Sequence, residues 1–280
     1  MSLTEGTACA SRGVFYIALG EPYRREARAS IASLRRHCPE LPVAVLTDEP
    51  DSMRDVADVL VEQPVVSNAR GKTAAKPRYM TLAPFEQNLF LDTDTRVLED
   101  IRPIFGLLDH YDLAVHFEGG PSRHGGGLHY HTLCNSGVFL FARRPEVADC
   151  LARYQNYYDQ AYANADERGS EHGLRDQRFL ALAIAESRAR PCHLGNFMNF
   201  TLWEPNLASS APAVIHGRYE PMDKLGARLR ASWREGEWER RLWLPGIRDY
   251  LAAGPRAAGP VLGAGLVLKR AWAEWKTRRA

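Results

Sequence analysis

Residues 88–97 read Asn88-Leu89-Phe90-Leu91-Asp92-Thr93-Asp94-Thr95-Arg96-Val97. The apolar run that ends at Leu91 predicts a short buried strand, and two carboxylates, Asp92 and Asp94, follow at its carboxyl end. Open α/β sheets bind ligands at that end of their strands. Because residues two apart on an extended chain point the same way, both carboxylates can share one hard divalent cation. A cation held in this way suggests a phosphate-bearing ligand.

The bulk composition predicts an ordinary soluble globular protein. Of its 280 residues, 45% are hydrophobic and 25% are charged, and the formal net charge of +2 gives no reason to expect nucleic acid as a partner. The five cysteines are dispersed and form no C-x-x-C pair, which favours free thiols in a reducing compartment. The first residues lack the apolar core of a signal peptide, and no apolar run reaches the ~20 residues that cross a bilayer. We therefore expect a cytoplasmic location.

Strand-like and helix-like segments alternate along the chain. Strands are expected at 14–19, 41–46, 56–61, 88–91, 113–117, 136–141 and 213–215, and helices at 23–37, 73–82, 101–108, 145–164 and 179–184. This alternation implies right-handed crossovers and a mainly parallel sheet, so the predicted class is α/β and Rossmann-like, with helices flanking the sheet. Residues 119–131 contain five glycines and three histidines, and we expect them to form a loop, and hypothesise a lid over a site.

The end of the chain differs from the rest, and we predict a main domain at 1–220 followed by a helical, Trp-rich and basic extension at 221–280. Five of the six tryptophans lie in the extension, where Pro245-Gly246 is expected to separate short helices. A helix within 260–280 would carry an apolar stripe with basic side chains nearby. We expect it to pack on the domain or to form a dimer contact, with peripheral contact to the inner face of the membrane as the alternative.

The order of these signals resembles the GT-A glycosyltransferases, and among them the glycogenin-like retaining enzymes. The resemblance runs from about Gly13 to about Tyr219 and leaves the extension unaccounted for. The family places a tyrosine such as Tyr23 against the nucleotide base and a basic residue such as Lys76 near the donor phosphates. The triplet Asp92-Thr93-Asp94 looks like the family's Asp-x-Asp motif, which holds a manganese ion that bridges the diphosphate.

Three later motifs continue the resemblance. Asn135-Ser136-Gly137-Val138 is similar to a strand whose first residues face the sugar, Asp176-Gln177 is similar to an Asp-Gln motif near the transferred sugar, and His216 matches the histidine that completes the metal site. The resemblance thus implies these site residues: catalytic, Asp176, Gln177 and Asn135; donor-binding, Tyr23, Lys76, Asp92, Thr93, Asp94 and Ser136; metal-binding, Asp92, Asp94 and His216.

The function that the resemblance implies is metal-dependent transfer of a sugar, hexose favoured, from a nucleotide-diphosphate donor, with a UDP-sugar favoured, and with retention. The acceptor would be a glycan, a lipid-linked sugar or a small molecule, and the cofactor Mn²⁺ with Mg²⁺ as the alternative. These residue types suit the chemistry, because a cation and Lys76 can stabilise the departing diphosphate, and two carboxylates with one imidazole suit manganese somewhat better than magnesium.

The family's phosphate-binding lysine after the histidine has no match here, so Arg218 or Lys224 is the candidate substitute. No position matches a self-glucosylating tyrosine.

Alternative interpretations remain open at this stage. Asp92 and Asp176 could cap helices, and His216 alone would more often be a core histidine. The chain could be an inactive nucleotide-sugar-binding or scaffold protein of the same fold, or an inverting transferase that uses Asp176 as its base. A haloacid-dehalogenase-like phosphatase is disfavoured by Arg96 and by the position of the motif. A nucleotidyltransferase is disfavoured because Gly20-Glu21-Pro22-Tyr23 is not a glycine-rich basic loop.

Overall fold

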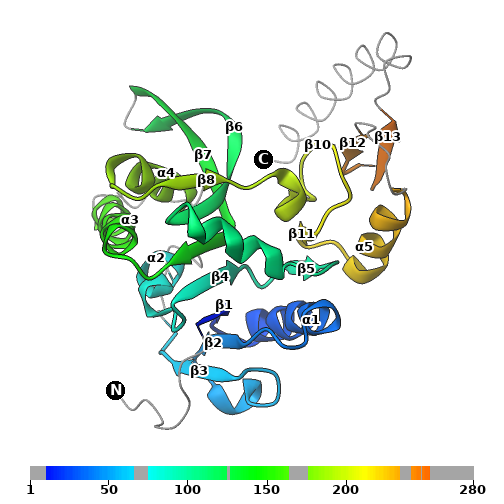
Figure 1. Cartoon of the computed structure of the whole chain (residues 1–280), viewed down its shortest axis with the longest axis horizontal. Coiled ribbons are helices and arrows are strands. Elements are labelled where there is room, and N and C mark those ends of the chain that lie inside the picture. The colour runs from blue at the N-terminus through cyan, green and yellow to red at the C-terminus, as the bar shows by residue number, and fades with distance from the viewer. Residues whose placement is uncertain are drawn as a thin grey trace.

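The structure is a computed structural model that describes residues 11–65, 75–124, 127–163, 176–233, 241–246 and 248–252. At its centre is a seven-stranded sheet in the order β3-β2-β1-β4-β7-β6-β8, with helices on both faces (Figure 1). Its strands are β1 (Arg12–Ala18), β2 (Val43–Thr47), β3 (Val59–Glu62), β4 (Gln87–Leu91), β6 (Leu113–His124), β7 (Gly127–Ala142) and β8 (Pro191–His193). Four of the six neighbouring pairs are parallel, and β7 runs antiparallel to β4 and β6. The prediction of a mainly parallel α/β sheet flanked by helices is confirmed.

Helices cover both faces of this sheet because successive side chains of a strand point to opposite faces. The helices are α1 (Glu21–His37), α2 (Ala75–Tyr79), α3 (Pro145–Ala163) and α4 (Gln177–Glu186), and the short 3₁₀-helices are η1 (Pro50–Met53), η2 (Met80–Leu82), η3 (Arg102–Asp109) and η4 (Asn196–Met198). On β1, Tyr16 packs into the core formed with α1 and η3, whereas its neighbour Phe15 packs into the core formed with α3 and α4. Burial of both faces explains why every residue of β2 is buried.

A second, smaller core is built from two three-stranded sheets and α5 (Met222–Ala231), on the right in Figure 1. One sheet has the order β5-β11-β9, with strands β5 (Thr95–Val97), β11 (Val214–His216) and β9 (Phe200–Thr201). The other has the order β10-β12-β13, with strands β10 (Asn206–Ala208), β12 (Arg241–Leu244) and β13 (Asp249–Ala252). Trp243 is fully buried here and meets Phe200 edge-on, with ring centroids 6.1 Å apart. Because β5 follows β4 after a short turn, residues 92–94 lie where the central sheet meets this smaller core.

The glycine-rich stretch is not the loop that the sequence predicts. β6 continues to His124 and β7 begins at Gly127, so the two strands pair as a long antiparallel hairpin (Figure 1). Their register shifts near Pro121, and such irregularities let a stretch that contains glycine and proline stay within a sheet. The pairing of β6 with β7 is set by the buried residues of β7. Main-chain hydrogen bonds do not require particular side chains, so they can extend this pairing into the glycine-rich stretch. The side chains of residues 119–132 lie outside the described part of the chain.

The expectation of a wholly helical extension is wrong for residues 241–252. These residues form β12 and β13, which pair antiparallel on either side of Pro245-Gly246, and β12 also pairs with β10. Pro and Gly favour a turn, and aromatic residues such as Trp243 favour strands when they pack against a core. α5 is the helix that the extension contributes among the described residues. The segment 253–280 lies outside them, and the domain boundary at residue 220 stays a prediction.

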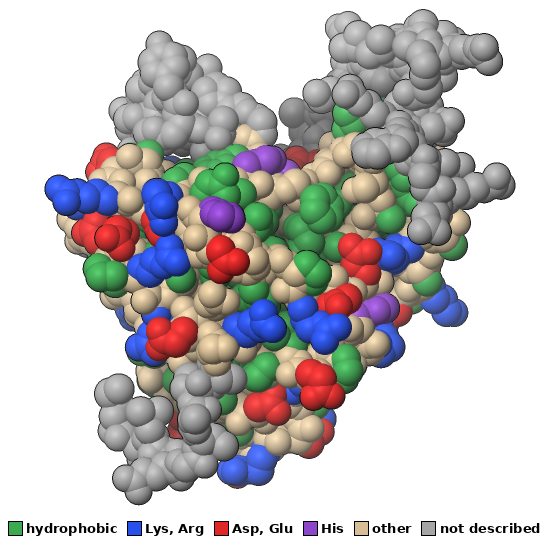
Figure 2. Space-filling view, viewed as in Figure 1, with side chains coloured by type: hydrophobic (Ala, Val, Ile, Leu, Met, Phe, Trp, Pro, Cys, Tyr) green, Lys and Arg blue, Asp and Glu red, His purple; other side chains and the backbone are tan. Residues whose placement is uncertain are grey.

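Surface and thiol chemistry are unexceptional in the described residues. None of the helices found there combines the length and apolar character needed to cross a membrane. Four cysteines, Cys38, Cys134, Cys150 and Cys192, are free thiols. On the face drawn in Figure 2, acidic and basic side chains are interspersed, in line with a formal net charge of +2.

Candidate active site

Asp92 and Asp94 leave β4 in a turn, not on the extended strand that the sequence suggests. Both the amide and Oγ1 of Thr95 donate to the Asp92 carbonyl, at 3.2 and 2.8 Å. The Asp92 amide donates to the carbonyl of Gly137 on β7 at 2.8 Å. The turn, anchored to β7, brings both carboxylates to the same place. The predicted convergence therefore holds, although its geometric reason is different.

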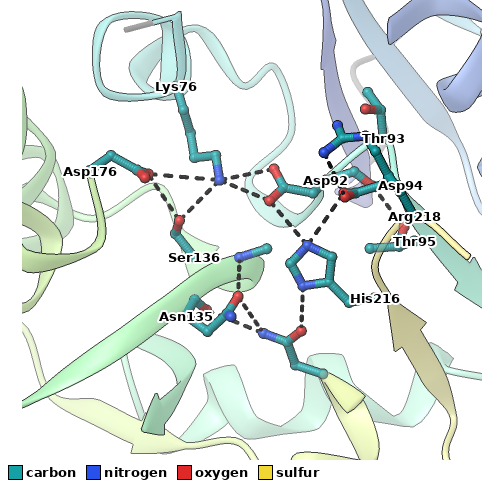
Figure 3. Close-up of polar contacts among 12 residues, drawn as sticks. Lys76, Asp92, Thr93, Asp94, Thr95, Asn135, Ser136, Asp176, His216 and Arg218 are labelled. Carbon is teal, nitrogen blue, oxygen red and sulfur yellow. Dashed lines mark hydrogen bonds and ion pairs between the residues drawn. The ribbon is translucent and has the colours of Figure 1, made fainter. Parts of the chain in front are cut away.

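His216 completes this group from a distant part of the chain. β11 runs antiparallel to β5 and sets His216 opposite Thr95. His216 Nε2 lies 3.3 Å from Asp94 Oδ1 and 3.5 Å from Asp92 Oδ2 (Figure 3). One candidate ligand atom from each residue lies within 4.8 Å of the others, and the described residues contain no second such group of His, Cys, Asp or Glu. Two carboxylate oxygens and one imidazole nitrogen form a donor set that fits a divalent cation such as Mn²⁺.

Asn199 orients the His216 ring. Asn199 Oδ1 lies 2.9 Å from His216 Nδ1, which places the proton on Nδ1 and turns Nε2 toward the carboxylates. Burial lowers the pKa of His216, but its hydrogen bonds to Asp92 and Asp94 outweigh burial and raise that pKa to about 9. The protonated imidazole therefore offsets one of the two carboxylate charges, and a bound cation would take the place of the proton on Nε2.

Gly137 makes room for the His216 ring. A Cβ atom at this position would lie 2.0 Å from His216 Cε1 and 2.5 Å from Nδ1, closer than any real contact. The glycine of the Asn-Ser-Gly motif is thus explained by close approach: any side chain here would displace the imidazole.

Lys76 on α2 connects the metal-binding group with the sugar-side residues. Its Nζ lies 2.9 Å from both carboxylate oxygens of Asp92, 3.0 Å from Ser136 Oγ and 3.7 Å from Asp176 Oδ2 (Figure 3). Burial lowers the pKa of the Lys76 ammonium, but Asp92 and Asp176 more than offset this and raise it above its ordinary value. The lysine therefore stays charged at the centre of the site, as an electrostatic role toward phosphate requires.

Asp176 does not cap α4, although it occupies the N-cap position. Its carboxylate makes no capping hydrogen bond. Instead, Asp176 Oδ2 accepts hydrogen bonds from Ser136 Oγ at 3.0 Å and from the Tyr154 hydroxyl at 2.6 Å. The capping interpretation is therefore wrong, and the carboxylate is held within the same polar network as Lys76. Gln177, the next residue, is half-buried, and its side-chain amide has no hydrogen bond to the described residues.

Asn135 is buried and lies behind the metal-binding group. Its Oδ1 accepts from the Gly137 amide and from Asn199 Nδ2, both at 3.0 Å, and its Nδ2 donates to Glu118 Oε1 at 3.1 Å. Through Asn199 it belongs to the chain of hydrogen bonds that orients His216. A direct sugar contact by Asn135 stays a prediction.

Tyr23 and Arg218 lie at the outer rim of the site, and the buried Thr93 is linked to Arg218 through Glu26. Arg218 Nη1 lies 3.3 Å from Asp94 Oδ2, and its guanidinium carbon is 6.0 Å from the centroid of the half-buried Tyr23 ring. Glu26 on α1 accepts from Arg218 Nε at 2.6 Å and from Thr93 Oγ1 at 2.8 Å. Of the two candidate substitutes for the missing lysine, Arg218 is thus the one that contacts the carboxylate group, whereas Lys224 lines a separate cavity.

Tyr154, Asn199 and Glu26 were not predicted from the sequence. Each touches a predicted residue across a separation of 17 or more positions, and none belongs to a motif. Tyr154 reads as an ordinary apolar position of a helix, and Asn199 lies in a short irregular segment. A signal for these roles exists only in the folded structure.

Comparison with known proteins places the fold. No protein-family model matches the sequence, and neither does any curated protein. Among solved structures, the glycosyltransferase GlyE of Streptococcus pneumoniae TIGR4 is similar with a TM-score of 0.53 and 15% identity, over 80% of this chain and 60% of GlyE. The bifunctional glycosyltransferase WbbM has a TM-score of 0.52 and 13% identity, over 78% of this chain and 47% of WbbM.

The galactosyltransferase LgtC, solved with donor and acceptor sugar analogues, is also similar, with a TM-score of 0.50 and 13% identity over 80% of this chain and 97% of LgtC. This chain therefore spans nearly all of LgtC but only 60% of the length of GlyE. Similarity at this level of identity establishes architecture. The chain has the GT-A fold seen in these glycosyltransferases.

Proposed function

We propose that this protein is a metal-dependent glycosyltransferase that moves a sugar from a nucleotide-diphosphate donor, with UDP-sugars favoured, to a hydroxyl-bearing acceptor with retention. The observation that carries the proposal is the convergence of Asp92, Asp94 and His216 beside Lys76 in a GT-A fold. LgtC was solved with donor and acceptor sugar analogues, which supports the same class of substrates.

The donor diphosphate would lie against the cationic part of the site. Asp92, Asp94 and His216 would hold the cation, which when bound supplies Lewis-acid stabilisation of the leaving diphosphate. Lys76 adds a fixed positive charge that needs no reorganisation during the reaction. Arg218, at the rim beside Tyr23, would contact the phosphates from outside, with the Tyr23 ring next to the base.

The sugar would lie on the Asp176 side of Lys76. In the reaction, the bond from the anomeric carbon to the diphosphate oxygen breaks, a bond to the acceptor oxygen forms, and the hydroxyl proton passes to the departing phosphate or to solvent. Asp176, held by Ser136 and Tyr154, would bind sugar hydroxyls and stabilise positive charge at the anomeric carbon. Gln177, whose side chain is free of protein hydrogen bonds among the described residues, would bind beside it.

The test is a thermal-shift panel of nucleotide sugars with and without Mn²⁺, followed by donor hydrolysis. A ligand that binds the native state raises the apparent stability, so at least one donor should raise Tm in the presence of Mn²⁺. In Asp94→Ala, both the metal-dependent shift and the hydrolysis should disappear. Normal metal and nucleotide binding in this variant would show that the site is wrongly assigned.

Two further results would decide whether the protein is catalytically active and whether the transfer retains the anomeric configuration. Binding without any turnover in the wild-type protein would favour an inactive nucleotide-sugar-binding protein. For stereochemistry, proton NMR of fresh product should show the donor's anomeric configuration, and an inverted product would make the enzyme an inverting transferase.

A further inference from the structure

A basic cavity of about 320 Å³ lies outside the candidate active site. Its lining includes the end of the segment that leaves β11, the first two turns of α5 and the turn between β12 and β13. Three of the lining residues are cations, Lys224, Arg228 and Arg248, and Glu220 is the one carboxylate among them. The volume is within the range of small-molecule sites, about 300–1,000 Å³.

The three cations have no carboxylate partner in the described part of the chain. The ion pairs found there include none formed by Lys224, Arg228 or Arg248. A second arginine-lined cavity, of about 420 Å³, provides the contrast. In that cavity the buried Asp112 accepts hydrogen bonds from Arg144 and Arg190, so two guanidinium groups share one carboxylate, and Glu146 is a second carboxylate in the lining. The lining of the basic cavity has three cations and one carboxylate, whereas the other cavity has three arginines and two carboxylates, so the basic cavity has the larger excess of positive charge.

The two guanidinium groups of the basic cavity are held in place by neutral partners. Arg228 Nη2 donates to the main-chain carbonyl of Arg248. Arg248 Nη1 makes a long, 3.5 Å hydrogen bond to the Glu220 carbonyl, and the guanidinium lies over the Tyr219 ring, 5.1 Å from its centroid. These contacts fix the position of each guanidinium without cancelling its charge.

Arg248 also has an uncommon backbone conformation. Its φ of 53° is in the left-handed region, and no other non-glycine residue in the described chain has a positive φ. In residues other than glycine this conformation has a free-energy cost, because the β-carbon approaches the backbone, and such conformations are enriched at turns and at functional sites. Arg248 closes the turn between β12 and β13, and it lines the cavity together with Arg228.

We propose that the basic cavity binds a phosphate monoester, either a soluble one or the headgroup of phosphatidic acid. Two fixed guanidinium groups match the oxygens of a phosphate in bidentate fashion, and Lys224, which is exposed and has no described partner, adds a point charge. A monoester is close to a dianion at neutral pH, which the excess positive charge can balance. None of the residues that line this cavity belongs to the candidate active site, so the inference does not depend on the proposed function.

The experiment uses the full-length protein with EDTA present, so that no divalent cation recruits phosphate to the Asp92 group. Isothermal titration measures binding of glycerol 3-phosphate, and flotation measures binding to phosphatidylcholine vesicles with and without phosphatidic acid. Lys224→Gln and Arg248→Gln should each weaken binding about tenfold, since each removes one charge-assisted contact. The matched control is Arg188→Gln, which removes an exposed arginine from the other cavity and should change nothing.

Each outcome decides the proposal. Binding of glycerol 3-phosphate that each variant weakens about tenfold supports a soluble ligand. Binding to phosphatidic acid vesicles alone, weakened in the same variants, supports the lipid headgroup. Absence of binding to every probe overturns the proposal. So does binding that Lys224→Gln leaves unchanged or that Arg188→Gln weakens to the same degree. Lys224→Gln keeps this test independent of folding, because the Lys224 side chain is exposed and has no described partner.

Discussion

The Tyr154 hydroxyl donates a 2.6 Å hydrogen bond to Asp176 Oδ2, and both side chains are buried. Burial, together with the Asp176 charge, raises the pKa of Tyr154 well above its ordinary value, so the hydroxyl stays a donor. Through this bond, a residue of α3 sets the orientation of a carboxylate at the start of α4. The Asp176 carboxylate, which is proposed to face the sugar, is thus held in position by the fully buried Tyr154.

Tyr154→Phe should lower kcat by about 10–100-fold, because a hydrogen bond to a charged group contributes about 1.5–3 kcal/mol. The affinity for Mn²⁺ and the KM for the donor should stay near wild type, since the metal-binding group is untouched. Steady-state kinetics and metal titration measure both. The control is Tyr157→Phe on the same helix, which removes an exposed hydrogen bond to Glu186. Equal loss of kcat in the two variants would contradict a positioning role for Tyr154.

Gly137→Ala should abolish high-affinity Mn²⁺ binding. Its Cβ would lie 2.0 Å from His216 Cε1, so the ring must move or the strand must shift, with overpacking costs of about 1–3 kcal/mol in stability. Electron paramagnetic resonance of free Mn²⁺ measures the affinity, and thermal unfolding measures the stability. Gly106→Ala is the matched control, because a Cβ at Gly106 meets nothing within 4 Å. Wild-type Mn²⁺ affinity in Gly137→Ala would mean that His216 is not a ligand.

Asn199→Ala should weaken Mn²⁺ binding by about 10–100-fold, the usual effect of removing a group that orients a ligating histidine. The fold should tolerate the change better than the site does, because His216 keeps its contacts with both carboxylates. Calorimetric titration with Mn²⁺ checks this expectation. Asn206→Ala removes a comparable amide hydrogen bond, to Thr201 Oγ1, and should leave the affinity unchanged. Wild-type Mn²⁺ affinity in Asn199→Ala would show that the His216 ring does not need the hydrogen bond to Asn199 to bind the metal.

Asp112 should make stability depend on pH in the acid range. Hydrogen bonds from Arg190 and Arg144, opposed by burial, hold the pKa of Asp112 below its usual range in the folded protein. Because the unfolded-state pKa is about 3.9, this stabilisation is present above about pH 4 and is lost as the pH falls from there through the folded-state pKa.

Asp112→Asn tests this dependence by urea denaturation between pH 3 and pH 7. The variant should lose about 1–3 kcal/mol relative to wild type at pH 7, and the difference should shrink as the pH drops below 4. The control is Asp51→Asn, which removes an ion pair with Arg54. Because the Asp51 side chain is 87% exposed, this change should have little effect on the free energy of unfolding. A difference between Asp112→Asn and wild type that stays constant down to pH 3 would contradict the prediction.

Several features follow from short stretches of the chain alone. The apolar run before Asp92 predicts a buried strand, and the alternation of such runs with helical patterns predicts the mainly parallel sheet that is observed. These patterns work because burial and backbone preference act on neighbouring residues. The residues Lys76, Asp92, Asp94, Ser136, Asp176 and His216 could also be selected in advance, since their order matches a family pattern, and the structure brings them together.

Other features depend on which strands pair and which helices pack, and no local pattern encodes that. His216 meets Asp94 because β11 pairs with β5, and Tyr154 meets Asp176 because α3 packs against α4. Residues 241–252 form a hairpin rather than a helix because Trp243 is buried against Phe200, some forty positions away in the chain. Local chemistry thus selected the groups able to act, whereas long-range packing set their distances, their charges and the partners that orient them.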